Sequence, residues 1–72
     1  MFSIGEFSKI SGFSIKALRH YHENGILVPK VIDRETGYRY YDFTSLQQAH
    51  VVESLRQMMF SLEQIKETMR VS

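Results

Sequence analysis

The sequence contains no cysteine, so it can form neither a disulfide nor a thiolate metal site, and its stability must come from packing. No apolar run approaches the ~20 residues that a membrane-spanning helix requires. The N-terminus lacks the cationic flank and apolar stretch of a signal peptide. A large excess of one charge is also missing, since the net charge is only +1. These absences favour a cytoplasmic protein, and the net charge gives only weak support to a nucleic-acid partner.

The chain is short, at 72 residues, and we expect one domain over 1–72. A chain of this size buries only ~60% of its unfolded surface, so the core must be small. The apolar share of 43% and the charged share of 24% are ordinary, which argues against a disordered chain.

Local signals divide the chain into four expected helices, at about 4–11, 15–24, 45–59 and from 62 onward. The pairs with capping-box spacing are Ser3/Glu6, Thr44/Gln47 and Ser61/Gln64, with Ser14 as a further N-cap. Gly12 and Gly25 can adopt the left-handed conformation that ends a helix, and Pro29 prevents the second helix from resuming.

Apolar residues recur at helical spacing and predict the inward faces. The expected sets are Ile4, Phe7 and Ile10; Ile15, Leu18 and His22; Val51, Val52, Leu55, Met58 and Met59; and Leu62, Ile65 and Met69. Residues 31–32 and 38–40 are β-type runs on either side of a turn-rich segment that ends in Gly37. The sequence therefore predicts a mostly α fold with one β-hairpin.

The first two expected helices are joined by a short turn containing Gly12, which is typical of a helix-turn-helix. Lys16, Arg19, His20 and Glu23 follow the i, i+3, i+4, i+7 pattern, so they share one outward stripe of the second helix. Such donors can meet base edges and phosphates in a major groove. Taken alone, the stripe fits the solvated face of an ordinary amphipathic helix better.

The expected hairpin favours a DNA contact over an ordinary solvated helix face. Side chains alternate along a strand, so Arg39 projects away from Tyr38 and Tyr40 and can reach a phosphate beside the groove. Tyrosine hydroxyls can donate to phosphates while their rings stay packed, although some of these rings can simply cover the core. A cationic helix followed by a cationic, Tyr-rich hairpin makes nucleic-acid binding the leading interpretation.

At this point the sequence resembles a known family. The segments that carry the resemblance are SIGE at 3–6, SIKALRHY at 14–21, TGYRYY at 36–41 and LEQI at 62–65. Together they are similar to the N-terminal DNA-binding domain of the MerR family of bacterial transcription regulators, especially its drug-responsive branch. The resemblance implies a winged helix-turn-helix with a β-hairpin wing and a second, helix-pair wing.

The resemblance also implies a set of DNA contacts, from a recognition helix at about 14–24 in the major groove and from both wings on the backbone. The predicted DNA-binding residues are Ser14, Lys16, Arg19, His20, Tyr21, Tyr38, Arg39, Tyr40 and Arg56. Members of the family usually carry tyrosine where this chain has His20. They also continue into a dimerisation helix and an effector domain, both of which 1–72 lacks.

The expected function is sequence-specific binding of double-stranded promoter DNA for transcription regulation, acting on RNA polymerase indirectly. A longer protein is expected to be a homodimer and this chain a monomer. No catalytic set is visible, and no cofactor or metal is expected, since His20 and His22 diverge by roughly 200° on a helix. Two alternatives remain, an excisionase-like architectural DNA-binding protein and a protein-interaction module that uses Met58, Met59 and Phe60. A gel shift with duplex DNA separates the second alternative from the other interpretations.

Overall fold

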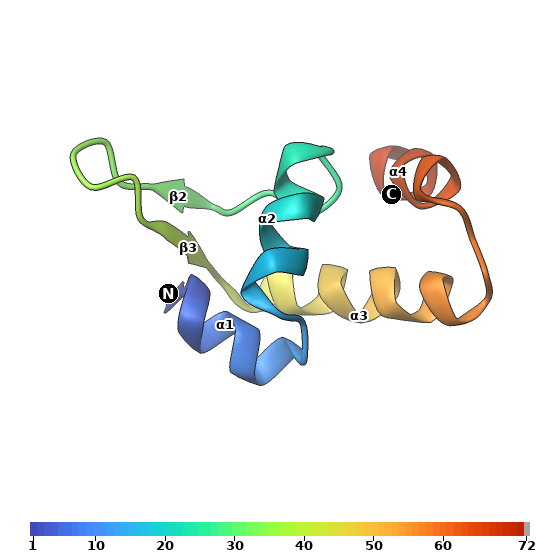
Figure 1. Cartoon of the computed structure of the whole chain (residues 1–72), viewed down its shortest axis with the longest axis horizontal. Helices are drawn as coiled ribbons and strands as arrows, with labels where there is room; N and C mark the ends of the chain where they lie inside the picture. The colour runs from blue at the N-terminus through green and yellow to red at the C-terminus, as the bar shows by residue number, and fades with distance from the viewer. Residues whose placement is uncertain (72) are drawn as a thin grey trace.

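The computed structural model describes residues 1–71, and Ser72, the last residue of the expected domain, lies outside them. The described elements are β1 (Phe2–Ser3), α1 (Ile4–Ser11), α2 (Ile15–Glu23), β2 (Val31–Ile32), β3 (Arg39–Tyr41), α3 (Phe43–Gln57) and α4 (Leu62–Val71). The fold is elongated, 36 × 21 × 20 Å, with the β2–β3 hairpin at one end, α4 at the other and α2 between them (Figure 1). The predicted mostly α fold with a hairpin is confirmed.

Helix α1 begins at the predicted capping box. The Ser3 hydroxyl accepts from the backbone N–H of Glu6 at 3.2 Å, and the Ser3 N–H donates to the Glu6 carboxylate at 2.8 Å. That backbone bond is the main reason why the pKa of Glu6 lies below its ordinary value. The predicted N-cap Ser14 likewise accepts from Ala17 N–H at 3.0 Å and starts α2.

The predicted start of α3 is wrong. The capping box is formed by Asp42 and Ser45 rather than by Thr44 and Gln47, and the helix begins at Phe43. The Asp42 carboxylate accepts from the Ser45 N–H at 3.0 Å and from the Thr44 hydroxyl at 2.6 Å. Because β3 ends at Tyr41, the chain enters α3 directly, and aspartate is among the strongest N-cap residues.

The strands form an antiparallel sheet in the order β1-β3-β2, so the N-terminal strand, which the sequence did not reveal, pairs with the hairpin. Phe2 lies opposite Tyr41, and Ile32 lies opposite Arg39. The Asp33 carboxylate closes the hairpin turn by accepting the backbone N–H groups of Glu35 and Thr36 at 2.8 and 3.0 Å.

The core is built around Tyr41 and Phe7, whose rings stack with centroids 4.4 Å apart. The other buried apolar residues are Phe13, Leu18, Tyr21, Ile26, Leu27, Ala49, Val52 and Ile65. Two residues predicted to face inward are instead exposed at the helix ends, Ile10 by 45% and Ile15 by 39%. Within α4, the predicted inward face is confirmed, with Ile65 buried and Leu62 and Met69 packed against the core.

The predicted inward stripe of α3 is wrong in most positions. Ser45, Ala49 and Val52 are buried, whereas Val51, Met58 and Met59 are exposed. The helix ends at Gln57, before the two methionines, and Met59 adopts a left-handed φ of 65° in the turn. A glycine is the usual residue at such a turn, and its absence hid the end of the helix.

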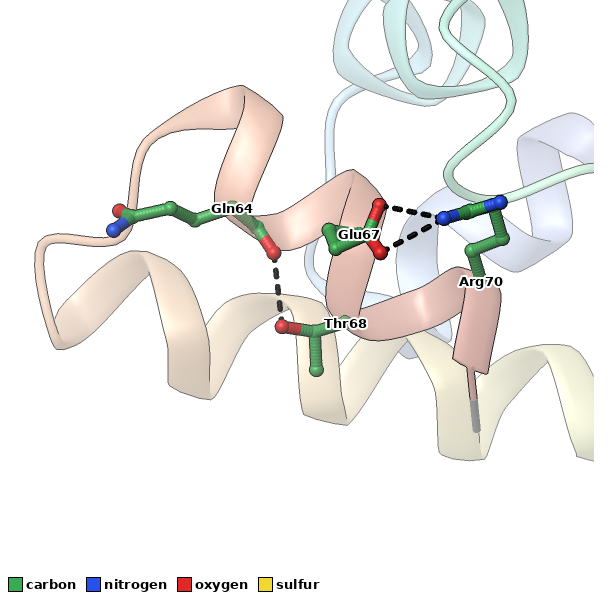
Figure 2. Close-up of polar contacts among 4 residues, drawn as sticks. All are labelled: Gln64, Glu67, Thr68 and Arg70. Carbon is green, nitrogen blue, oxygen red and sulfur yellow. Dashed lines mark hydrogen bonds and ion pairs between the residues drawn. The ribbon is translucent and has the colours of Figure 1, made fainter.

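Helix α4 starts at the predicted capping box, where Ser61 and Gln64 exchange hydrogen bonds of 2.8 and 3.1 Å. Figure 2 shows polar contacts along this helix, where the Arg70 guanidinium donates to both carboxylate oxygens of Glu67, at 2.8 and 3.0 Å. The Thr68 hydroxyl donates to the Gln64 carbonyl at 2.8 Å on the same helix. Arg70 is therefore an ion-paired cation on an exposed surface.

Candidate nucleic-acid interface

The turn between α1 and α2 sets the orientation of the outward stripe. Gly12 ends α1 with a φ of 81°, and the Ser8 hydroxyl donates to the Phe13 carbonyl at 2.6 Å across the turn. Phe13 is buried, so the turn is fixed to the core from inside. Ser14 then stands exposed at the start of α2, with its hydroxyl engaged in the cap.

Helix α2 separates its two faces as the sequence predicts. Leu18 is fully buried on the inner face. Lys16, Arg19, His20 and Glu23 are all exposed. Asn24 donates from its side-chain amide to the His20 carbonyl at 2.9 Å, which closes the last turn below the His20 ring. The stripe therefore presents long and aromatic donors on one continuous helical surface.

Tyr21, which the resemblance put among the DNA contacts, lies largely inside the fold. Its side chain is only 6% exposed, and its ring packs against Phe13 with centroids 5.5 Å apart. The helical spacing places position 21 beside Leu18, on the inner face. The Tyr21 side chain also interacts with Arg56 of α3, whose pKa it raises. The Tyr21 ring thus belongs mainly to the core, and a contact between Tyr21 and DNA stays a prediction.

Arg56, the predicted basic contact of the helix pair, lies on the exposed side of α3. Its pKa is raised first by the Tyr21 side chain, whose oxygen can accept from the guanidinium, and then by the Glu53 carboxylate, which lies 3.8 Å from Nε. Both interactions favour the charged guanidinium. They also place a cation of α3 beside the recognition helix.

On the other side of α2, the hairpin contributes Arg39. This side chain is half-buried, and its Nε donates to Nδ1 of His22 at 3.1 Å. Tyr38 is 65% exposed, while Tyr40 is half-buried, so only one of these two rings is largely free to meet a ligand. Sequence reasoning assigned His22 to the inner face and missed its bond to Arg39, because nothing local links residues 17 positions apart.

A groove of about 410 Å³ separates the hairpin from the helix-turn-helix. The residues lining it are Ser3, Ile4, Arg19, Thr36, Gly37, Tyr38 and Arg39. The fold thus brings Arg19 and Arg39 to one concave surface, although they lie on different elements. Neither carries an ion pair within residues 1–71, so both can bind an anion.

The described part of the chain contains neither a metal site nor a membrane-spanning helix. Among residues 1–71, no group of three or more His, Cys, Asp or Glu side chains could hold a metal ion. None of the helices described is long and apolar enough to cross a membrane.

The helix-turn-helix, the hairpin beside it and the α3–α4 pair together define a winged helix-turn-helix domain. Residues 2–71 match the family described as "MerR HTH family regulatory protein", and the chain belongs to this family. The resemblance found in the sequence is therefore confirmed. The named relatives are regulators, which also confirms that the chain is not an enzyme.

Similar proteins include the multidrug-efflux transporter 1 regulator of Bacillus subtilis, 40% identical over 65 residues that make up 90% of this chain and 23% of the relative. The heavy metal-dependent transcription regulator 2 of Rhizobium meliloti is also 40% identical over 65 residues, 90% of this chain and 44% of the relative. The chain thus spans less than half the length of these relatives.

Solved structures agree in fold. The EcmrR–DNA complex in EcmrR-RPo, determined by cryo-EM, has a TM-score of 0.84 and 35% identity, over 97% of this chain and 31% of that one. The N-terminal part of MtaN, the Bacillus subtilis multidrug transporter activator, has a TM-score of 0.85 and 30% identity, over 93% of this chain and 62% of that one.

Proposed function

We propose that this domain binds double-stranded promoter DNA sequence-specifically and thereby regulates transcription, with α2 as the recognition helix in the major groove. The observation that carries the proposal is the arrangement of cations. Lys16 and Arg19 lie on the exposed stripe of α2, and Arg39 and Arg56 lie on the elements at its two sides. A helix that reads bases between two cationic flanks fits the geometry of a winged helix-turn-helix on a duplex.

The proposed contacts are of two kinds, those to base edges and those that hold the phosphate backbone. Lys16, Arg19 and His20 face base edges and nearby phosphates from α2, and the exposed N-cap Ser14 stands at the end of that helix. The DNA-bound form of the similar EcmrR supports this orientation, because its fold agrees over 97% of this chain. The proposed holding contacts to the backbone come from Tyr38, Arg39, Tyr40 and Arg56.

A pair of arginine variants tests the proposal. Arg19→Ala should weaken binding to the target duplex by about 1–3 kcal/mol, since a bidentate arginine contact discriminates by that amount. Arg34→Ala is the matched control, because Arg34 is an exposed cation in the hairpin turn, outside the residues proposed to contact DNA. Fluorescence anisotropy with labelled duplex gives both affinities, and equal losses would argue against α2 as the reader.

Salt dependence gives a second test. If Lys16, Arg19, Arg39 and Arg56 each neutralise a phosphate, log K should fall with log salt with a slope of about −3 to −4. Binding that stays constant as salt rises would contradict a phosphate-gripping role for these four cations.

The family resemblance supports further proposals about the whole protein. Promoter DNA is the direct partner, and RNA polymerase is affected indirectly, in line with the DNA complex that the similar EcmrR forms in EcmrR-RPo. We place the protein in the bacterial cytoplasm, where such DNA lies. The longer protein is a homodimer through segments outside this domain, whereas the 72-residue chain alone is a monomer. Sedimentation velocity at micromolar concentration tests this, and a stable dimer would contradict it.

The exposed methionines favour a second candidate role. Met58 is 64% and Met59 88% exposed, which fits a protein-binding surface better than a core position. A gel shift with duplex DNA separates the candidates, because a pure protein-interaction module would give no salt-dependent shift. An excisionase-like architectural role would also give a shift, and the genomic sequence after Ser72 distinguishes it from a regulator.

A further inference from the structure

The contact between His22 and Arg39 links the recognition helix to the hairpin. His22 belongs to α2 and Arg39 to β3, and the bond between Arg39 Nε and His22 Nδ1 is 3.1 Å long and partly buried. The two residues lie 17 positions apart in the sequence, so the bond joins two separate elements of the fold. The other polar side-chain bonds of the hairpin, made by Asp33 and Thr36, are local and stay inside the turn.

The bond defines the state of both partners. Because Arg39 Nε donates, His22 Nδ1 must offer a lone pair, which the tautomer with its proton on Nε2 supplies. The arginine remains charged, and it uses one of its five N–H groups. The four N–H groups on the two terminal nitrogens make no other hydrogen bond within the described residues. This terminal pair matches a phosphate in a bidentate way.

The pairing of β3 with β1 fixes the base of the hairpin, whereas little else fixes the direction of its distal part. Strand β2 has two residues and β3 three, and Val31 and Ile32 are 45% and 47% exposed. The apolar anchor, Tyr41, lies at the base of the hairpin and leaves its distal part without core contacts. Short exposed strands open and reorient easily.

We propose that His22 is a positioning residue for DNA binding, which sets the distance and angle between the Arg19 stripe and the Arg39 cation by holding Arg39 from α2. This inference rests on the proposed function. Arg19 and Arg39 line the same groove of about 410 Å³, so a fixed Arg39 presents its terminal nitrogens to a phosphate that flanks the groove read by α2. Preorganised cations lose less conformational freedom on binding, which raises affinity.

A related contact on the other flank fits this assignment. The residue before His22, Tyr21, interacts with Arg56 of α3 and raises the pKa of its guanidinium. Consecutive residues of the recognition helix therefore interact with one cation on each side of it.

The experiment compares His22→Leu, which removes the acceptor, with His22→Gln, whose amide oxygen can accept from Arg39 Nε. Affinity for the target duplex is measured by fluorescence anisotropy, and thermal unfolding is followed for each variant. We expect about a five- to tenfold loss of affinity for His22→Leu and less than about threefold for His22→Gln, as a lost hydrogen bond to a charged group predicts. Rescue by glutamine separates positioning from a purely structural role.

A double-mutant cycle completes the test. On an Arg39→Gln background, His22→Leu should cause less than about a twofold further loss, because the two side chains act as one unit. Should His22→Leu not fold, His22→Phe keeps an aromatic ring without an acceptor and repeats the comparison. Wild-type affinity for both acceptor-free variants, or full additivity with Arg39→Gln, would overturn the inference while leaving DNA binding intact. A wild-type chain that binds no duplex would overturn the proposed function and this inference together.

Discussion

The hairpin and the helix pair stand on opposite sides of α2 and are held in different ways (Figure 1). The α3–α4 pair is fixed by burial, with Val52 at 0% and Ile65 at 2% exposure. The hairpin is fixed at its base by the buried Tyr41 and beyond it by hydrogen bonds, among them the bond between Arg39 and His22. The comparison teaches that packing positions one cationic flank and directional polar contacts position the other.

The largest expected effect comes from removing the one deep anchor of the hairpin. Tyr41→Ala should lower the free energy of unfolding by about 3–5 kcal/mol, since it deletes a fully buried ring stacked on Phe7. Chemical denaturation followed by circular dichroism measures this change. Tyr38→Ala is the control further along the hairpin, and its 65% exposure predicts a change within about 0.5 kcal/mol.

Tyr41→Phe refines that test. The Tyr41 hydroxyl is buried without a hydrogen-bond partner in the described part of the chain, and its burial raises the pKa of this group. Removing the hydroxyl should therefore leave stability unchanged or raise it by up to about 1 kcal/mol. A clear destabilisation would mean that the hydroxyl is satisfied in solution.

An isoleucine pair compares the two flanks directly. Ile65→Ala in α4 should cost about 2–4 kcal/mol of unfolding free energy, because it leaves a cavity beside the core. Ile32→Ala in β2 makes the same chemical change at a position that is 47% exposed, and should cost less than about 1 kcal/mol. The same denaturation series measures both, and similar costs would show that the hairpin is packed more deeply than its exposure indicates.

A smaller gain is expected at the turn of the helix pair. Met59 holds a left-handed φ of 65° while 88% exposed. That conformation costs a side-chain-bearing residue about 1–2 kcal/mol, and glycine avoids this cost at a backbone-entropy penalty of about 0.5–1 kcal/mol. Met59→Gly should therefore raise the melting temperature slightly, whereas Met58→Gly, at a φ of −84°, should lower it.

The smallest effect concerns acid and the hairpin turn. The pKa of Asp33 lies below its ordinary value of 3.8, chiefly because the backbone N–H groups of Thr36 and Glu35 bond the carboxylate. A lowered pKa stabilises the fold above the ordinary value, and this contribution is lost as pH falls through the folded value, from about pH 5 to about pH 2. Asp33→Asn keeps an acceptor without a charge, so its melting temperature should fall less with acid over this range.

The local signals of the sequence were sufficient for most helix boundaries. Ser3, Ser14 and Ser61 start their helices as predicted, and Gly12 ends α1. The start of α3 was misplaced because Thr44 and Gln47 have the spacing of a capping box, two residues after the true N-cap Asp42. The end of α3 was misplaced because a methionine occupies the left-handed turn.

The exposed residues of the candidate site could be predicted from the sequence, whereas the contacts that hold them in place could not. Lys16, Arg19 and His20 follow from helical spacing alone, as does their separation from Leu18. The role of His22 and the burial of Tyr21 did not follow, since both depend on what lies against α2.

The sequence by itself determined where α1, α2 and α4 start, which residues form the outward stripe of α2 and to which family the chain belongs. These features depend on contacts within about one helical turn, or on residue types at fixed spacing. Only the tertiary structure decided that Tyr21 is buried, that Met58 and Met59 are exposed, and that Arg39 is held by His22. Such pairings join segments far apart in the chain, and they are selected by the packing of the whole core rather than by any local preference.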